Sequence, residues 1–242
     1  MDVRRSFLII VDISGYTRFI KLHRFAVLHA EYIINELLKS VIDRSHYPFV
    51  LNKLQGDSAF FYAVEARDEF GASSVLDQVI DLFSAFRRSE KELISECDMC
   101  FCEACRNIGK LYLKAIVHYG DVIFKTISNF EELAGEAIIL SHRLVKNKIN
   151  QQEYILMSQS FYILEDLAFD GSIHHGKEHC DGIGDVEVVV FQFGDVAETA
   201  PYQSTLGRRL ARLLDMEVYL FRRLLGKKSE RDFDNLAASQ AE

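Results

Sequence analysis

The sequence has little positive charge: 28 lysines and arginines stand against 36 aspartates and glutamates, for a formal net charge of −8. This balance would repel a phosphate backbone, so no nucleic acid partner is expected. Nowhere do eighteen apolar residues follow one another, and Asp12 interrupts the first apolar run after only a few residues. The sequence therefore predicts neither a membrane-spanning helix nor a signal peptide, and we expect a cytoplasmic protein.

Proline is also scarce. Only Pro48 and Pro201 occur, and the second lies in VAETAPYQST, the best candidate for a linker. With 49% hydrophobic residues, the 242-residue chain can bury a substantial core. We expect one domain over residues 1–197, followed over 198–242 by a linker, an amphipathic helix and a flexible tail.

Hydrophobic patterning predicts the secondary structure. Short apolar segments rich in β-branched residues predict strands over 7–11, 49–54, 59–64, 111–118, 154–157 and 186–193. Apolar residues spaced three to four apart predict helices over 16–42, 73–94, 134–147 and 206–228. This order is typical of an α+β fold with helices on one face of a sheet. The arginine-rich last helix is expected to cover a core or a dimer partner, and no membrane contact is expected of it.

Two aspartates follow predicted strands. Asp12 ends the first apolar run before Ser-Gly-Tyr-Thr, and Asp57 follows Gly56 in a tight connection between the second and third strands. Converging carboxylates are typical of a divalent-metal site, and a Gly-containing turn that opens a helix can bind an anion beside it. The alternative interpretation is structural: Asp12 caps the helix and Asp57 only forms a turn.

Four motifs in this order resemble the class III nucleotidyl cyclases, the adenylate and guanylate cyclase homology domain. They are VDISGYTRFI, KLQGD, VHYGDV and LAGEAIILSHRL, and the resemblance covers about residues 6–195. It implies a ferredoxin-like cyclase fold, with a central, mostly antiparallel sheet, working as a homodimer. The implied reaction converts ATP to cyclic AMP and pyrophosphate.

The resemblance also implies roles for individual residues. Asp12, Asp57 and the carbonyl of Ile13 would bind Mg²⁺ or Mn²⁺. The phosphates would lie on the amides of Ser14, Gly15, Tyr16 and Thr17. Lys53 and Glu132 would read the adenine base, which favours ATP over GTP, and Arg143 would stabilise charge on the α-phosphate.

The sequence departs from the family at two places. Ile139 stands where the family has a ribose-orienting asparagine, and His142 and Asn147 are the polar residues nearby that could replace it. Near residues 181–183, where the family often has a phosphate-binding lysine, this sequence has none, and Lys177 is the nearest basic residue. An isoleucine cannot donate the missing hydrogen bond, so a second hypothesis stays open. In it the protein is a catalytically degenerate module that binds a nucleotide or dimerises.

Five cysteines are an odd number, and four of them lie at Cys97, Cys100, Cys102 and Cys105. This clustering favours a metal or reduced-thiol site over the disulfide framework of a secreted protein. Three interpretations of the cluster stay open. A structural Zn²⁺ bound by the four thiolates and a set of reduced, partly buried cysteines have equal weight, and a redox-sensing disulfide ranks third. The spacing of the histidines, including His29, indicates no ligand set.

Overall fold

The computed structural model describes residues 2–22, 27–66, 69–128, 130–193, 202 and 204–225. The predicted domain boundary at 197, the end of the predicted helix after residue 225 and the predicted flexible tail lie outside the described residues, as does most of the predicted linker.

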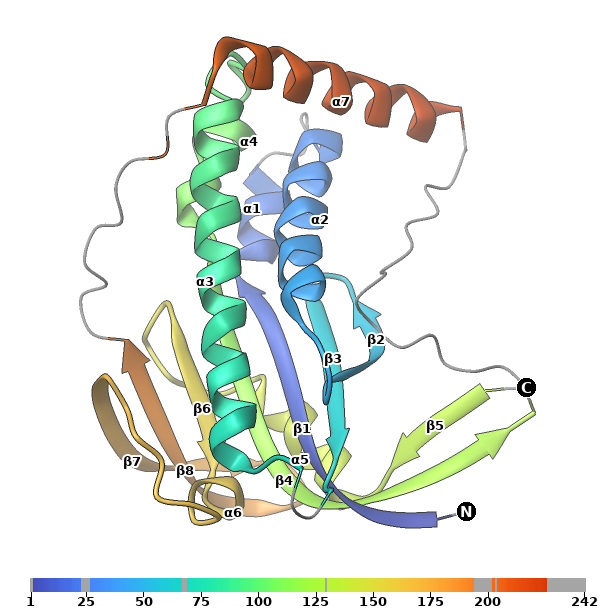
Figure 1. The fold of residues 1–242 in the computed structure, drawn as a ribbon, viewed down its shortest axis with the longest axis vertical. Coiled ribbons are helices and arrows are strands. Elements are labelled where there is room, and N and C mark those ends of the chain that lie inside the picture. Colours follow the sequence, from blue (N-terminus) through green and yellow to red (C-terminus); the bar gives the residue numbers. More distant parts are fainter. Residues whose placement is uncertain are drawn as a thin grey trace.

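A mostly antiparallel sheet forms the centre of the protein (Figure 1). Its strands are β1 (Asp2–Ser14), β2 (Val50–Gln55), β3 (Ser58–Val64), β4 (Tyr112–Ile127), β5 (Phe130–Ala134), β6 (Tyr154–Ser158), β7 (Gly171–Cys180) and β8 (Gly184–Phe193). The order across the sheet is β2-β3-β1-β4-β6-β8-β7, with β5 paired to β4. Strands β4 and β6 run parallel.

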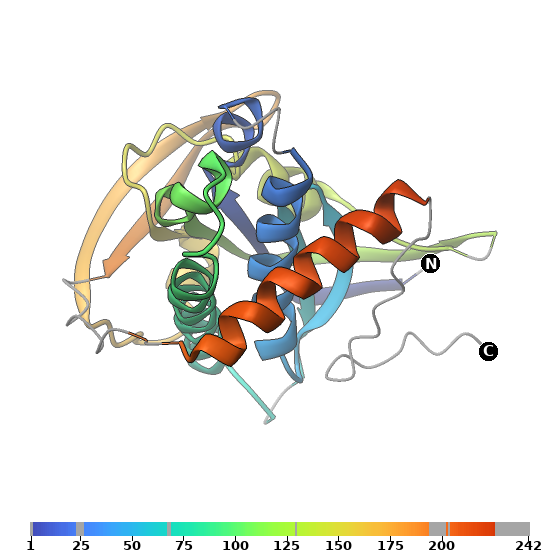
Figure 2. The ribbon, with the colours of Figure 1, turned by 90° about the horizontal axis from the view of Figure 1, so that it is seen from above.

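Helices lie against this sheet. They are α1 (Tyr16–Leu22), α2 (Val27–Arg44), α3 (Ala72–Glu96), α4 (Glu103–Arg106), α5 (Glu136–Leu144), α6 (Gln159–Tyr162) and α7 (Leu206–Leu224), with a 3-10 turn over Ile108–Lys110. The long helices α2 and α3 stand side by side, and α7 crosses their ends (Figures 1 and 2).

Strand β1 is buried on both of its faces, which explains its unbroken apolar run. Phe7, Ile9 and Val11 belong to the core formed with α2 and α3, whereas Leu8 and Ile10 belong to a second core formed with α5. The α+β class and the mostly antiparallel central sheet are confirmed. The expectation that the helices share one face needs a correction, because α5 packs on the face opposite α2 and α3.

All six predicted strands are present, and two further strands were not predicted. Strand β7 is an edge strand whose side chains are mostly exposed and polar, so it lacks the apolar alternation that identifies a strand. Strand β5 is short and pairs with the far end of β4. The first predicted helix is represented by α1 and α2.

Helix α7 is anchored through one face. Met216 is buried, and Arg212 pairs with Glu36 of α2 at 2.8 Å and with Glu96 of α3 at 2.7 Å. The opposite side carries exposed apolar residues: Leu206, Leu210, Leu214, Val218, Phe221 and Leu225. Helix α7 therefore packs on α2 and α3 through the side of Met216 and Arg212, whereas most of the apolar stripe that was expected to cover a core or a dimer partner is exposed. No helix in the described part of the chain is long and apolar enough to cross a membrane.

Candidate active site

The two aspartates converge at one end of the sheet. Asp12 lies on β1 directly opposite Ser58 of β3, next to Asp57 in the turn between β2 and β3. The amide of Ile13 donates a hydrogen bond to the carbonyl oxygen of Asp57 at 3.1 Å. Gly56 has φ 64°, a conformation that glycine adopts without strain, so this tight turn can hold Asp57 against β1.

The carboxylates influence each other. Burial, and next the negative charge of Asp12, raise the pKa of Asp57 to about 6. Repulsion of this kind is relieved when a cation binds between two carboxylates. The carboxylates of Asp12 and Asp57, with the carbonyl of Ile13 next to Asp12 on β1, are thus a donor set that fits a hard divalent cation.

A lysine of the chain already lies at this place. Lys114, opposite Asp12 on β4, brings Nζ to 3.1 Å from Oδ2 of Asp12 and donates a hydrogen bond to the carbonyl oxygen of Val145 at 3.1 Å. Both members of the ion pair are largely buried. A divalent cation on Asp12 would therefore compete with Lys114, a residue that the sequence analysis did not single out.

The predicted phosphate-binding segment opens α1. Gly15 has φ 93°, and a Cβ atom there would approach the carbonyl oxygen of Lys110 to 3.2 Å, so glycine suits both the conformation and the close packing. Tyr16 donates a hydrogen bond to Glu31 at 3.2 Å, and Thr17 is exposed.

A cleft of about 470 Å³ lies beside this segment. Ser14 and Gly15 line it together with two basic residues, Arg18 and Lys110. The cleft thus places positive charge next to the amides that are predicted to bind phosphates.

The base-reading and charge-stabilising candidates are spread over other elements. Lys53 of β2 lies 5.9 Å from the ring centroid of Phe60, and its charge, after the larger effect of burial, lowers the pKa of His142 on α5. Lys53 is therefore close to α5. On that helix Arg143 places Nη1 3.8 Å from Oδ2 of Asp181, and its side chain is about half exposed.

Glu132 lies apart from these residues. It faces Lys125 in the arm that β4 and β5 form at the side of the sheet (Figure 1). Among the described residues, no hydrogen bond or ion pair joins Glu132 to Lys53. One chain thus brings Asp12 and Asp57 together but does not join the two predicted base-reading residues.

The residues at which the sequence departs from the cyclase motifs lie in three different environments. Ile139 is 53% exposed on α5. Asn147 accepts hydrogen bonds from Tyr154 at 2.9 Å and from the amide of Ile149 at 3.0 Å, so its side-chain oxygen serves local structure. Lys177 pairs with Glu187 at 3.6 Å across β7 and β8.

The histidine of the VHYG motif is a core residue. His118 is buried with Nδ1 2.8 Å from the hydroxyl of Ser158, and burial lowers its pKa to about 4. A Cβ atom on Gly120 would lie 3.0 Å from Nε2 of His118. Gly120 therefore leaves room for the side chains of His118 and Ala137.

The cysteine cluster gains a histidine from another part of the chain. His29 of α2 lies with Cys100, Cys102 and Cys105 in a group whose donor atoms are all within 4.8 Å of one another. Cys97 is buried in the core at the end of α3. Because 71 residues separate His29 from Cys100, only the folded chain reveals this group, and no spacing in the sequence could have indicated it.

The fold is that of the class III nucleotidyl cyclase domains. The chain is similar to the adenylyl cyclase CyaB from P. aeruginosa, with a TM-score of 0.55 and 14% identity over 83% of this chain and 98% of that one. The guanylyl cyclase Cya2 gives a TM-score of 0.58 and 14% identity, over 83% and 98% of the chains. An adenylate cyclase from Trypanosoma brucei gives 0.54 and 15%, over 82% and 92%.

By sequence, residues 34–154 match the family described as "Protein of unknown function (DUF2652)", and the chain belongs to that family. One relative is the "Uncharacterized protein Rv2561/Rv2562" of Mycobacterium tuberculosis (strain ATCC 25618 / H37Rv), 36% identical over 125 residues. This match spans 51% of the chain and 56% of the relative's length. The family match includes Asp57, the cysteine cluster and Arg143, and begins after Asp12.

Proposed function

We propose that this protein is a metal-dependent nucleotidyl cyclase that converts ATP to cyclic AMP and pyrophosphate as a homodimer. The observation that carries the proposal is the convergence of Asp12 and Asp57 at one end of the sheet, where the charge of Asp12 helps to raise the pKa of Asp57. The cyclase-like fold supports it, since strand ends in this fold hold the carboxylates that the resemblance assigns to the metal.

In the proposed reaction the ribose 3′-oxygen of ATP attacks the α-phosphorus. The bond from the α-phosphorus to the bridging oxygen of the β-phosphate breaks, pyrophosphate leaves, and the hydroxyl proton is lost to solvent. A divalent cation held by Asp12, Asp57 and the carbonyl of Ile13 would favour ionisation of the attacking hydroxyl and neutralise the departing pyrophosphate.

The residues of the chain bind and orient the substrate. Backbone amides of residues 14–17 donate to the β- and γ-phosphates, with Arg18 and Lys110 in the adjoining cleft wall adding positive charge. Arg143 stabilises the charge that develops on the α-phosphate. Its half-exposed side chain has a single weak partner, Asp181, among the described residues, so it is free to turn toward a nucleotide.

Selection of the base and assembly are linked. Lys53 donates to a ring nitrogen of adenine while Glu132 accepts from its amino group, which favours ATP over GTP. The resemblance places the metal aspartates and the base-reading residues on different subunits, so the site is completed by a second copy of the chain. Asp12 and Asp57 of one subunit then act with Lys53, Glu132 and Arg143 of the other, giving two equivalent sites.

A second function is favoured by two specific observations. Ile139 offers no hydrogen bond to a ribose, and the buried pair of Lys114 with Asp12 supplies internally the positive charge that a metal would bring. A cyclase-fold module that binds a nucleotide or dimerises without turnover would have these features.

Product analysis separates the two functions. Purified protein is incubated with ATP or GTP and Mn²⁺ or Mg²⁺, and products are identified by mass spectrometry, with nucleotide binding measured in parallel. Cyclic AMP from the wild type and none from Asp57→Asn supports the cyclase. Binding without a cyclic product supports the module, and equal product from Asp57→Asn would refute the metal-dependent mechanism.

A further inference from the structure

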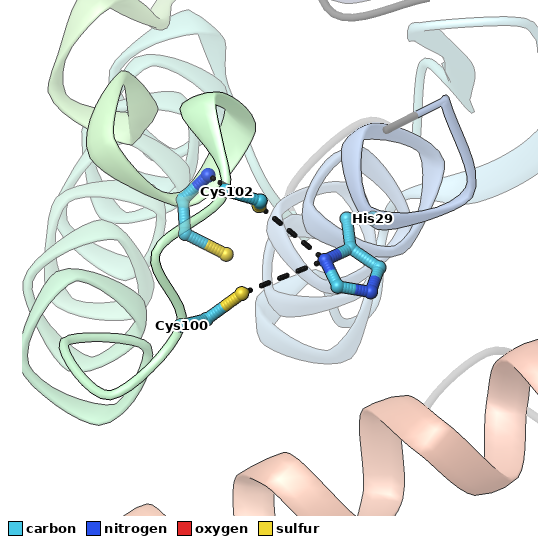
Figure 3. A group of neighbouring side chains, drawn as sticks. His29, Cys100 and Cys102 are labelled. Atoms are coloured by element: carbon cyan, nitrogen blue, oxygen red, sulfur yellow. Dashed lines mark hydrogen bonds between the residues drawn. The ribbon is translucent and has the colours of Figure 1, made fainter. Parts of the chain in front are cut away.

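Four soft metal-binding atoms meet at the top of the helical layer, away from the two aspartates. His29, in the first turn of α2, faces the loop that follows α3 and carries Cys100 and Cys102 (Figure 3). Cys105 of α4 completes the group, and all of its donor atoms lie within 4.8 Å of one another. Every cysteine of the group is free, so each thiol is available as a ligand.

The distances suit a tetrahedral ion. Zn–S bonds of about 2.3 Å and Zn–N bonds of about 2.0 Å at tetrahedral angles place sulfur and nitrogen about 3.5 Å apart. Nδ1 of His29 lies 3.3 Å from Sγ of Cys102 and 3.6 Å from Sγ of Cys100. Because both sulfurs approach the same nitrogen, Nδ1 is the ligand atom that the arrangement selects.

The backbone orients one of the sulfurs. Cys102 is the N-cap of α4, and its Sγ accepts a hydrogen bond from the amide of Cys105 at 3.4 Å. The same bond fixes the orientation of the cysteine side chain, as outer hydrogen bonds do in metal sites.

Cys97 lies next to the group but outside it, and its thiol is hydrogen-bonded to that of Cys105. It is 3% exposed in the core formed by α2, α3 and the sheet, and its amide donates to the carbonyl oxygen of Leu93 at 2.8 Å to close the last turn of α3. The donor set is therefore three cysteines and a histidine from two distant segments, in place of four cysteines from one short run.

We infer that His29, Cys100, Cys102 and Cys105 bind one zinc ion in a closed structural site. Three thiolates and one imidazole are ligands that zinc prefers, and four protein ligands leave no position open for a substrate. The ion would link the start of α2 to the loop between α3 and α4.

The proposed zinc site is connected to the cleft beside residues 14–17 by a short stretch of backbone. The chain runs from Cys105 into the 3-10 turn of Ile108–Lys110, and the carbonyl of Lys110 is the atom against which Gly15 packs. Lys110 also lines the cleft. Zinc binding would thus hold one wall of the cleft in place from outside the candidate active site.

Metal analysis of matched variants tests the site. Protein is purified under reducing conditions without added metal, and zinc is measured by elemental analysis. We expect about one zinc per chain for the wild type and for Cys97→Ser, less than about a tenth of that for His29→Ala, and about one again for His29→Cys. The last variant restores a fourth ligand and shows that the loss in His29→Ala reflects ligation.

Cobalt substitution gives a second measurement that does not depend on His29→Ala folding. Co²⁺ bound to thiolates has charge-transfer absorption that grows with the number of thiolates, so His29→Cys should absorb about one third more than the wild type, with four thiolates replacing three. A wild type without zinc, a Cys97→Ser variant that loses it, a His29→Ala variant that retains it, or equal absorption by wild type and His29→Cys would each overturn the assignment.

Discussion

Removing the charge of Asp57 should stabilise the metal-free protein. The pKa of this carboxyl is raised from 3.8 to about 6, by burial and then by the charge of Asp12. A shift of this size corresponds to about 3 kcal/mol, and solvent screening of a partly buried group reduces it to about 1–2 kcal/mol. Asp57→Asn retains the shape of the side chain and carries no charge.

The gain in stability from Asp57→Asn should grow as the pH rises. The folded carboxyl holds its proton more tightly than the unfolded one, so the wild type loses stability as the pH rises from about 4 to about 6 and regains none above that. In urea unfolding with a chelator, Asp57→Asn should therefore exceed the wild type by about 1–2 kcal/mol near pH 7.5. Near pH 4 the difference should be close to zero.

Two comparisons make this test specific. Asp77→Asn removes an exposed carboxylate from α3 and should show no such pH-dependent gain. Mn²⁺ should stabilise the wild type, by about 2.7 kcal/mol at one hundred times its dissociation constant, and leave Asp57→Asn unchanged. A destabilised Asp57→Asn at pH 7.5, or a gain equal at both pH values, would refute the reasoning that repulsion between carboxylates prepares a cation site.

Four further predictions follow. Asp12→Ala and Arg143→Ala should each be inactive, and mixing them should restore up to half the activity of the mixed dimer, unless the site lies within one chain. Lys53→Glu should reduce the preference for ATP over GTP in competition assays; unchanged discrimination would remove Lys53 from base reading. Arg212→Ala should lower the free energy of unfolding by about 3 kcal/mol, because it removes the cation that pairs with two largely buried glutamates, Glu36 and Glu96; a loss below about 1 kcal/mol would contradict this. Because burial lowers the pKa of His118 to about 4, its contribution to stability should fall by up to about 3 kcal/mol between about pH 6.5 and pH 4, and His118→Gln should remove that part of the pH dependence in urea unfolding.

Much of the fold could be predicted from the sequence because its central strands are buried. Continuous apolar segments such as 7–11 and 154–157 predict buried strands without knowledge of the strands that pair with them. The helical periodicity of 73–94 agrees with the observed α3. The edge strand β7 could not be predicted because exposed polar residues carry no such pattern. The side of the sheet that α5 covers was missed because periodicity identifies an apolar face without identifying its partner.

Those residues of the candidate site that lie beside recognisable turns in the sequence could be predicted. Asp12 lies near the end of β1 and Asp57 follows β2, and both strands pair with β3, so the convergence of the two aspartates follows from the strand order. Lys114 was missed because its meeting with Asp12 depends on the register of β1 and β4, which the sequence pattern does not determine. His29 was missed for the corresponding reason in the helical layer, where the packing of α2 against the loop after α3 decides which side chains meet.

The two candidate metal sites are connected by packing, and this connection has a consequence for the proposed function. Gly15 belongs to the segment whose amides are proposed to bind phosphates, and it packs on the carbonyl of Lys110. Lys110 follows the proposed zinc ligand Cys105 by one short helical turn and a 3-10 turn. Since a side chain at Gly15 would clash with that carbonyl, the distance between the two segments has little freedom. A zinc ion that fixes the loop after α3 would therefore also fix the position of the phosphate-binding amides, whether the protein turns its nucleotide over or only holds it.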